Sequence, residues 1–350
     1  MTSTYQPGLR VSEYVLEERI GAGTFGEVWR ARHHIWQDER VAIKLPTEPE
    51  YVRYIQREGI VVHGLRHPNI VRVIGLDPYA DIPYLVMELV RGPSLRQVIS
   101  EHPRGVPIDV AVTILRGLLN AMVTAHANNV LHRDLKPGNV MLNLEERPLA
   151  AVRPEDVKVS DFGLGVGNPD TLRQIMQSAS IDREDRLVGT MAYMAPELRD
   201  GRQQADARSD LYSVGVILFE LLCGERPVGA ELPSTLRAEV PAALDEVFRG
   251  LYARYERRYE SAAAALADLE RLLRPAPEVR PLPAQPAPPR AARRSCPACG
   301  QVVEPQDQFC TQCGKQLVAR VRRCAACGGY PGPDDLFCIF CGARLPPGAE

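Results

Sequence analysis

Eight of the nine cysteines in this 350-residue chain lie between residues 296 and 341, which commits that stretch to a metal-bound or cross-linked fold. They form two copies of one pattern, CxxCG, ten residues from its second cysteine to the next, then CxxCG, at an offset of 28 residues. We call each CxxCG segment a knuckle. Four thiolates from two knuckles suit a tetrahedral Zn²⁺ site that has no open coordination position. The two ligand sets are Cys296, Cys299, Cys310 and Cys313, and Cys324, Cys327, Cys338 and Cys341. We expect two structural zinc ions, because units this short lack a core without metal.

Disulfides are the alternative use of these cysteines, and the expected compartment decides between the two. The N-terminus lacks the basic and then apolar run of a signal peptide. The most apolar stretch, residues 211–223, carries Glu220 and is shorter than the roughly 20 apolar residues of a membrane span. We therefore expect a cytoplasmic protein without a membrane anchor, where reducing conditions disfavour disulfides. The ninth cysteine, Cys223, ends an apolar helix and is expected to be a buried thiol.

The charge of the cysteine-rich tail bears on its partners. Residues 293–350 hold seven Lys or Arg and five Asp or Glu, and the whole chain has a formal net charge of −2. This balance does not favour nucleic-acid binding. We expect the tail to be a module for protein docking or self-association.

The rest of the chain divides into a strand-rich and a helical region. Short β-branched and apolar runs predict strands over 11–20, 27–32, 41–45, 71–76 and 84–89, and apolar spacing predicts a helix over 51–65. Helices are predicted over 110–126, 211–222 and 261–273. Seven prolines between 274 and 289 predict an extended linker. We expect one α+β domain over 10–273, a Pro/Ala/Arg-rich linker over 274–294, and paired cysteine units (296–313 and 324–341) within 295–345.

A glycine-rich segment lies at the start of the strand-rich region. Gly21, Gly23 and Gly26 have the spacing that lets a backbone turn close over phosphates. A Rossmann turn needs a helix directly afterwards, whereas residues 27–32 alternate like a strand, so we favour a glycine-rich β-hairpin. Lys44 ends the next strand and needs an anionic partner if buried, and Glu58 on the predicted helix is the candidate.

Two further motifs carry acids and an amide. The segment His132-Arg-Asp134-Leu-Lys136-Pro-Gly-Asn139 follows an apolar helix. There Asp134 could orient and deprotonate a hydroxyl, and Lys136 could neutralise a transferring phosphoryl group. Asp161-Phe-Gly follows a strand, where a carboxylate suits Mg²⁺. Gly189-Thr190 lies ahead of Ala195-Pro-Glu197, and Asp210 precedes the long apolar helix.

In this order and with these intervals, the motifs resemble the protein kinase superfamily, specifically the eukaryotic-like Ser/Thr kinases, over about residues 10–273. The resemblance implies a bilobal fold, with a β-rich N-lobe and a helical C-lobe. It also implies transfer of the ATP γ-phosphoryl group to a protein hydroxyl. The cysteine units resemble tandem zinc ribbons of the double-zinc-ribbon type. The alternative is a catalytically weak kinase-fold scaffold that acts through the ribbons.

The resemblance assigns roles residue by residue. It makes Asp134 the catalytic base, with Lys136 on the γ-phosphate and Asn139 and Asp161 holding Mg²⁺. Lys44, paired with Glu58, contacts the α- and β-phosphates. The nucleotide pocket is implied to comprise Ile20, Gly21, Gly23, Gly26, Val28, Ala42, Lys44, Glu58, the gatekeeper Met87, the hinge residues Glu88 and Val90, and Met141.

Regulation and departures from the family pattern complete the expectations. Arg133, beside Asp134, suggests that a phosphate on the activation segment activates the enzyme, with Thr171, Ser178 and Ser180 as candidate sites and Thr190 serving the substrate pocket. Residues 144–156 should form a surface excursion, and residues 223–260 leave little room for the usual helices. Arg254-Tyr255 replaces an Asp-Pro pair common in relatives, yet Arg258 should still pair with Glu197.

Overall fold

The protein is described by a computed structural model that covers residues 5–23, 26–162, 191–199, 204–273, 294–304, 307–332 and 335–346. The chain divides into two compact units, Met1–Arg274 and Pro275–Glu350. Each unit is described separately below. Most of the expected linker, 274–293, lies outside the described residues.

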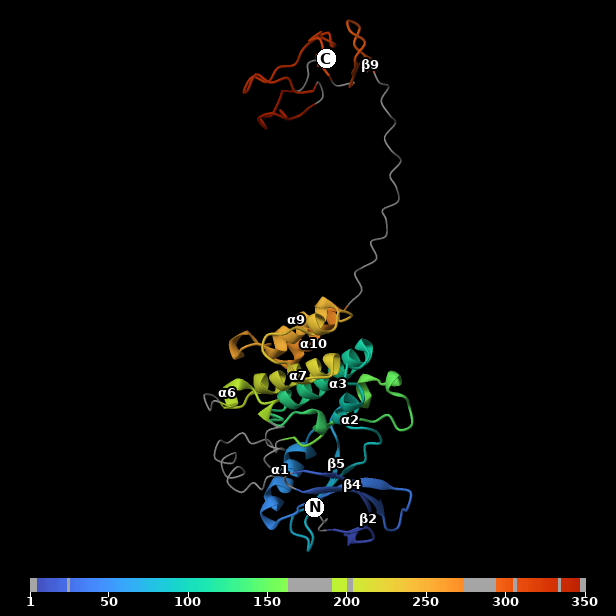
Figure 1. The fold of residues 1–350 in the computed structure, drawn as a ribbon. Coiled ribbons are helices and arrows are strands. Elements are labelled where there is room, and N and C mark those ends of the chain that lie inside the picture. The colour runs from blue at the N-terminus through green and yellow to red at the C-terminus, as the bar shows by residue number, and fades with distance from the viewer. Residues whose placement is uncertain are drawn as a thin grey trace. The chain divides into compact units, whose positions relative to one another are not determined.

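The N-terminal lobe of the first unit is a six-stranded antiparallel sheet in the order β1-β2-β3-β4-β6-β5 (Figure 1). Its strands are β1 (Arg10–Val11), β2 (Tyr14–Ala22), β3 (Glu27–His33), β4 (Arg40–Leu45), β5 (Val73–Asp77) and β6 (Tyr84–Glu88). The single strand expected over 11–20 is wrong. Ser12 adopts φ 50°, in the left-handed region, and this turn separates β1 from β2.

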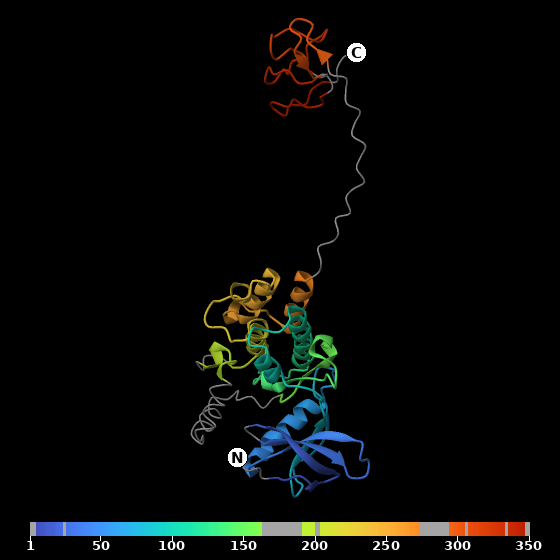
Figure 2. The same cartoon turned by 45° about the vertical axis from the view of Figure 1, so that its right-hand side comes forward.

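One helix packs on this sheet. A short 3₁₀ turn, η1 (Pro49–Tyr51), leads into α1 (Val52–His63), the blue helix that lies along the sheet in Figure 2. This helix buries Ile55, Glu58 and Val62. A Cβ added at Gly59 would lie 2.8 Å from Leu76 Cδ2, so glycine permits the close approach of α1 to β5. This packing brings Glu58 to the sheet.

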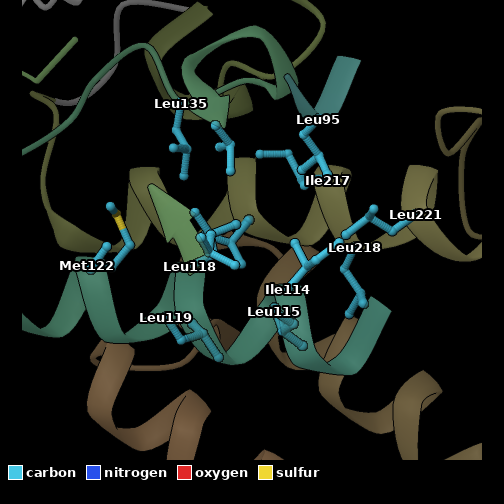
Figure 3. Close-up of a cluster of buried hydrophobic side chains, with 14 of the residues drawn as sticks. Leu95, Ile114, Leu115, Leu118, Leu119, Met122, Leu135, Ile217, Leu218 and Leu221 are labelled. Atoms are coloured by element: carbon cyan, nitrogen blue, oxygen red, sulfur yellow. The ribbon is translucent and has the colours of Figure 1, made fainter. Parts of the chain in front are cut away.

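The second lobe is helical. Its longer helices are α2 (Leu95–Glu101), α3 (Ile108–Ala127), α7 (Ala207–Cys223), α9 (Ala242–Tyr252) and α10 (Ala262–Leu272), with short helices α6 (Pro196–Arg199) and α8 (Pro233–Leu236). Leucine and isoleucine side chains of α3 and α7, including Ile114, Leu118 and Ile217, are buried against each other (Figure 3). Between residues 223 and 260, α9 packs on α7, so this stretch holds one full helix as well as α8 and the 3₁₀ turn η5 (Tyr255–Arg257).

The helix α3 is long and apolar enough to cross a membrane by length and composition alone. However, 61% of its most apolar window is buried inside the first unit. This burial is the pattern of a core helix.

A two-stranded ladder, β7 (Val140–Leu142) and β8 (Val157–Val159), lies between the lobes' main elements, preceded by the 3₁₀ turn η2 (Pro137–Asn139). The excursion that joins the two strands contains η3 (Leu149–Ala151) and η4 (Pro154–Asp156). Arg147 closes it by donating to Asp156 (2.7 Å). A Cβ at Gly117 would lie 2.5 Å from Pro154 O, so the excursion packs tightly on α3 and is not a free surface loop.

The second unit contains two small ribbons with little regular structure. β9 (Arg294–Ser295) pairs with β10 (Val302–Val303), and isolated bridges join Phe309 to Gln316 and Phe337 to Arg344. Each ribbon's apolar cluster consists of two buried cysteines and one aliphatic residue, Val303 or Leu345. Such a cluster is too small to stabilise a fold alone.

Candidate active site and metal centres

Lys44, Glu58 and Asp161 meet where the two lobes face each other. Lys44 Nζ donates to Glu58 Oε2 at 2.7 Å and also to Asp161 Oδ1. The Lys44–Glu58 pair expected from the sequence is therefore present, and Asp161 is added to it. Three segments separated by up to 117 residues converge on one ammonium group.

The electrostatics of this cluster favour a charged lysine. Burial works to lower the pKa of Lys44, but the carboxylates of Asp161 and Glu58 outweigh it and raise that pKa. Burial raises the pKa of Glu58 to about 7. The pKa of Asp161 falls to about 2, because Lys44 and then His132 and Lys136 outweigh its own burial. Asp161 thus stays ionised and can hold a divalent cation.

The segment 132–139 gathers the second polar group of the site. Lys136 Nζ donates to Asp134 Oδ2 at 2.8 Å, and Asn139 Nδ2 donates to Asp134 O at 2.9 Å. Among the described residues, the buried Asp134 Oδ1 has no hydrogen-bond partner. A buried acceptor without a donor is costly, so this oxygen suits a hydroxyl that enters with a substrate.

Asp210 holds the backbone ahead of Asp134. Its carboxylate accepts from the backbone N–H groups of His132 and Arg133, both at 2.9 Å, and contacts His126 Nε2 at 2.9 Å. These bonds, outweighing burial, lower the pKa of Asp210. The sequence motifs included Asp210 but gave it no role. The feature that could have indicated its role is its position as an acidic residue at the start of a buried helix.

Arg133 is prepared for an anion. Its φ is 67°, and its buried Nε has no partner in the part of the chain that the structure describes. Gly163, Gly189, Thr190 and the three candidate phosphorylation sites Thr171, Ser178 and Ser180 lie outside the described residues.

The glycine-rich hairpin joins β2 to β3. Gly23 N donates to Gly26 O at 2.9 Å, which closes the turn. A Cβ at Gly26 would lie 2.2 Å from Leu45 O, so a larger residue there cannot keep this backbone path. Gly21 pairs with Val28 across the hairpin. Glycine at position 26 therefore permits the close approach of this backbone to the end of β4.

The residues expected around adenine cluster on β4 and β6. Ala42 pairs with Met87 in register, and both pack with Val28 and Val90. Ile20 stays largely exposed on β2. The structure places Met141 separately, on β7, where it bridges to Ser94.

The hinge is tied to the second lobe by a side chain that sequence reasoning did not anticipate. Lys158 Nζ on β8 donates to Glu88 Oε1 at 2.9 Å, and Arg72 N donates to the same oxygen at 2.9 Å. The side chain of Glu88 thus fixes the end of β6.

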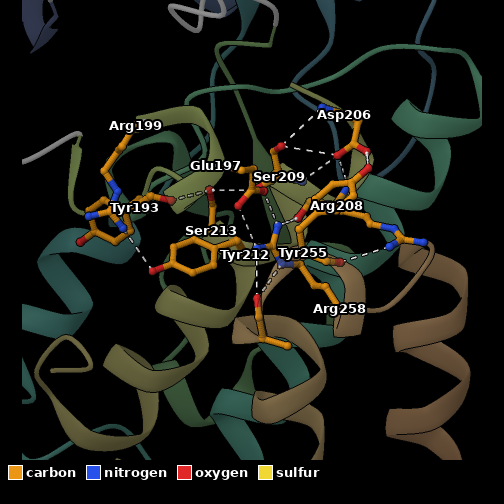
Figure 4. Close-up of polar contacts among 11 residues, drawn as sticks. Tyr193, Glu197, Arg199, Asp206, Arg208, Ser209, Tyr212, Ser213, Tyr255 and Arg258 are labelled. Atoms are coloured by element: carbon orange, nitrogen blue, oxygen red, sulfur yellow. Dashed lines mark hydrogen bonds and ion pairs between the residues drawn. The ribbon is translucent and has the colours of Figure 1, made fainter. Parts of the chain in front are cut away.

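A buried polar network supports the substrate side of the helical lobe (Figure 4). Arg258 pairs with Glu197 at 2.7 Å, as predicted, and its side chain is 0% exposed. Tyr255, at the departure from the family pattern, donates to Asp206 Oδ2 at 2.6 Å. Asp206 in turn caps α7 by accepting from Arg208 N and Ser209 N. The replaced Asp-Pro pair is thus compensated by a tyrosine that holds the α7 cap.

A cavity of about 310 Å³ opens beside Pro137 of the segment 132–139. Arg96, Tyr193, Glu220 and Arg226 are among its lining residues. Tyr193 OH donates to Glu220 at 2.8 Å, and burial raises the pKa of Glu220. This cavity has room for a ligand side chain beside Pro137.

Each four-cysteine set of the second unit has the geometry of a metal site. All cysteines are free thiols, and sulfur–sulfur contacts of 3.6 Å in the first set and 3.6 and 3.8 Å in the second are far longer than a disulfide bond. Tetrahedral Zn²⁺ with sulfur at about 2.3 Å requires sulfur–sulfur distances near 3.8 Å. Both sets fit Zn²⁺.

The knuckle glycines and amides support these sites. Gly300, Gly314, Gly328 and Gly342 all have φ between 71° and 76°, which a side chain disfavours. Ala298 N donates to Cys296 Sγ at 3.4 Å and lowers the pKa of that thiol to about 7. The ninth cysteine, Cys223, is half-buried and not fully buried as expected, and burial raises its pKa to about 11.

Comparisons with known proteins agree with this geometry. A family model described as the protein kinase domain matches residues 14–286, and one described as a zinc-ribbon domain matches residues 292–317. The chain is 33% identical over 288 residues to the serine/threonine-protein kinase PkaA of Streptomyces coelicolor, covering 77% of this chain and 48% of that protein. It is 31% identical over 283 residues to the serine/threonine-protein kinase PknB of Mycobacterium tuberculosis, covering 74% and 42%.

The fold is also matched by a solved structure. The crystal structure of the Mycobacterium tuberculosis PknI kinase domain superposes with a TM-score of 0.58 at 23% identity, covering 77% of this chain and 100% of that one. The chain spans less than half the length of the two named curated relatives. With a kinase-domain match over most of its length and a zinc-ribbon match beyond it, the chain belongs to the protein kinase family.

Proposed function

We propose that the protein is a Ser/Thr protein kinase that transfers the γ-phosphoryl group of ATP to protein hydroxyls. The observation that carries this proposal is the convergence of Lys44, Glu58 and Asp161, with the unpartnered Asp134 Oδ1 in the same unit. A catalytically weak scaffold is the second candidate. It has no chemical need for this set of charges, so we favour the enzyme.

The residues divide the work of one displacement. The substrate hydroxyl oxygen forms a bond to the γ-phosphorus while the bond to the bridging oxygen of ADP breaks. Asp134 Oδ1 orients that hydroxyl and accepts its proton, and Lys136 lies where it can offset charge on the transferred group. Lys44, kept charged by its carboxylates, holds the phosphates. Asn139 and Asp161 would hold Mg²⁺, which neutralises phosphate charge when bound.

Activation by phosphorylation belongs to the same proposal. The buried Arg133 Nε lacks a partner among described residues, and a phosphate on the activation segment would supply one. We assign Thr171, Ser178 and Ser180 as candidate autophosphorylation sites. Phosphosite mapping of active enzyme after incubation with ATP and Mg²⁺ tests this, and three unmodified residues in active protein would refute it.

The tail supplies a separate function in this proposal. The ribbons over 295–345 hold two structural zinc ions, follow the linker 274–294, and dock a protein partner in the cytoplasm. Support comes from the closed four-thiolate sets and from the balanced charge of residues 293–350. Metal analysis should find two zinc ions per chain.

Comparison of Asp134→Asn with the wild type tests the enzymatic proposal. We expect phosphate incorporation into a generic protein substrate to fall by about 10²–10³-fold, because the base is lost while the fold is kept. Asp109→Asn, an exposed acid at the start of α3, is the matched control and should retain full activity. Equal incorporation by wild type and Asp134→Asn, at equal thermal stability, would favour the scaffold.

A further inference from the structure

The two zinc ribbons share a cysteine framework but carry different side chains around their second knuckles. At five positions offset by 28 residues, the first ribbon has Gln308, Phe309, Thr311, Gln312 and Gln316, and the second has Leu336, Phe337, Ile339, Phe340 and Arg344. Only the phenylalanine is shared. We call Leu336, Phe337, Ile339 and Phe340 the apolar knuckle.

In the first ribbon this face is used to join the ribbons. Gln308 is 6% exposed; its Nε2 donates to Pro331 O, and its Oε1 accepts from Arg322 N at 2.6 Å. Phe309 meets the ring of Tyr330 edge to face, with centroids 5.2 Å apart. These polar and aromatic contacts engage Gln308 and Phe309, whereas the polar side chains of Thr311, Gln312 and Gln316 stay exposed.

In the second ribbon the same face is open. Leu336, Phe337, Ile339 and Phe340 are 72%, 57%, 72% and 64% exposed. Leu336 stands where Gln308 makes its hydrogen bonds and cannot repeat them. If another ribbon packed on this face, Leu336 could not satisfy that ribbon's backbone N–H and C=O groups as Gln308 does. The face therefore suits a more apolar partner.

The knuckle is held in place without a partner. A Cβ at Gly329 would lie 2.7 Å from Phe340 Cδ2, so the ring packs directly over the glycine backbone. The first ribbon has Gln301 and Gln312 at the equivalent positions. An exposed aromatic side chain that is already ordered loses less entropy on binding.

Size and charge select the occupant. Four side chains exposed to this degree present on the order of 500 Å² of apolar surface, well above scattered exposure but below the roughly 800 Å² per partner of a stable dimer. Arg344, exposed, is bridged to Phe337, where the first ribbon has Gln316. The first ribbon has Lys315 and Gln316 where the second has Ala343 and Arg344, so in the second ribbon the positive charge lies directly at the position that bridges to Phe337. Two copies meeting through this face would bring their Arg344 side chains together, which opposes self-association.

We propose that the apolar knuckle docks a short segment of another protein that offers at least two large apolar side chains and a carboxylate for Arg344. The inference rests on the docking function proposed for the ribbons and specifies the face and the partner chemistry. The first ribbon serves as the internal reference, because it has the polar residues Thr311 and Gln312 in place of Ile339 and Phe340 and has no arginine at position 316.

The test is selection of a phage-displayed random peptide library on the zinc-loaded full chain, with counter-selection on Ile339→Thr/Phe340→Gln. These two substitutions transplant the residues of the first ribbon onto exposed positions, so the fold and both zinc ions should be retained. We expect enriched peptides to combine apolar and acidic residues. One synthesised peptide should bind the double variant at least about tenfold more weakly and Arg344→Gln about threefold more weakly by fluorescence anisotropy. Thr311→Ala/Gln312→Ala is the matched control and should bind like the wild type.

Several outcomes would overturn the proposal. They are the absence of enrichment over the variant, enrichment of basic or purely polar peptides, tighter binding of a single-stranded oligonucleotide than of any selected peptide, or a dimer in sedimentation that the double variant abolishes. Phosphoryl transfer and zinc content are measured on the same preparations. If peptide binding by the apolar knuckle is absent while kinase activity and two zinc ions are present, the docking proposal fails and the proposed function does not.

Discussion

The two units of this chain are held together by different means. The first unit buries long aliphatic and aromatic side chains, among them Leu118, Ile217 and Phe219, in a continuous core. Among the described residues of each ribbon, two cysteines and one aliphatic residue form the buried apolar cluster, with one further side chain, Leu317 or Ala343, packed partly buried against it. Packing therefore stabilises the catalytic unit, whereas sulfur–metal bonds must stabilise the ribbons. The same substitution or treatment should affect the two units very differently.

Zinc removal should give the largest contrast. Structural zinc contributes about 10–16 kcal/mol to units of this kind, so a strong chelator should unfold both ribbons completely. The thermal transition of the first unit should stay unchanged. Amide NMR spectra and calorimetry of the full chain, before and after chelation, would measure both. Native-like ribbon resonances in the metal-free protein would contradict the claim that zinc stabilises the ribbons.

Core truncation should show the reverse pattern. Leu118→Ala removes a side chain that is 0% exposed and should destabilise the first unit by about 3 kcal/mol, while the ribbon resonances are unaffected. Leu336→Ala in the exposed knuckle is the control, with an expected change within about 0.5 kcal/mol. Denaturant titrations provide both values. Equal losses would mean that the knuckle contributes to folding.

Within the first unit, a buried and an exposed ion pair should contribute very different amounts to stability. Arg258→Ala leaves Glu197 buried without its partner, and a loss of about 3–5 kcal/mol is expected. Arg271 pairs with Asp268 on an exposed helix face, so Arg271→Ala should change the free energy of unfolding far less than Arg258→Ala does. A loss with Arg258→Ala as small as that with Arg271→Ala would show that the network in Figure 4 is not structural.

A pH dependence at Glu58 provides a further contrast within the first unit. Burial raises its pKa to about 7, so the folded state binds this proton more tightly than the unfolded state. The resulting stability is complete below the ordinary pKa of 4.5 and is lost as pH rises through 7. Relative to Glu58→Gln, the wild-type Tm should therefore fall by about 6 °C between pH 4.5 and 7.5, since a shift of this size corresponds to about 3 kcal/mol. A constant Tm difference across that range would contradict the raised pKa.

Local patterns predicted most elements of the fold. The helix 51–65 followed from apolar spacing, and α1 occupies Val52–His63. The strand 11–20 was wrong because Ser12 carries no residue-type signal for its left-handed backbone. The stretch 144–156 was expected to form a surface excursion, but nothing local indicates that Arg147 closes it or that Gly117 lets it pack on α3.

Ordered motifs located the site, but its supporting contacts required the fold. The pairing of Lys44 with Glu58 and of Arg258 with Glu197 could be predicted because both pairs recur with the family's motifs. The hydrogen bonds of Asp210 to the backbone of His132 and Arg133, and the Lys158–Glu88 pair, join segments that no local pattern relates. Burial and opposite charge select these contacts only after the chain has folded.

In the second ribbon, the cysteines that stabilise the fold and the side chains of the apolar knuckle are different residues, and this affects how the tail can evolve. Mutations on an ordinary binding surface are constrained, because the side chains that recognise a partner often also hold the fold, and a gain in one is a loss in the other. In the second ribbon the cysteines carry the fold and Ile339 and Phe340 lie outside it. Recognition can then change without a stability cost, which makes this ribbon a module whose partner can be exchanged while the first unit stays the same.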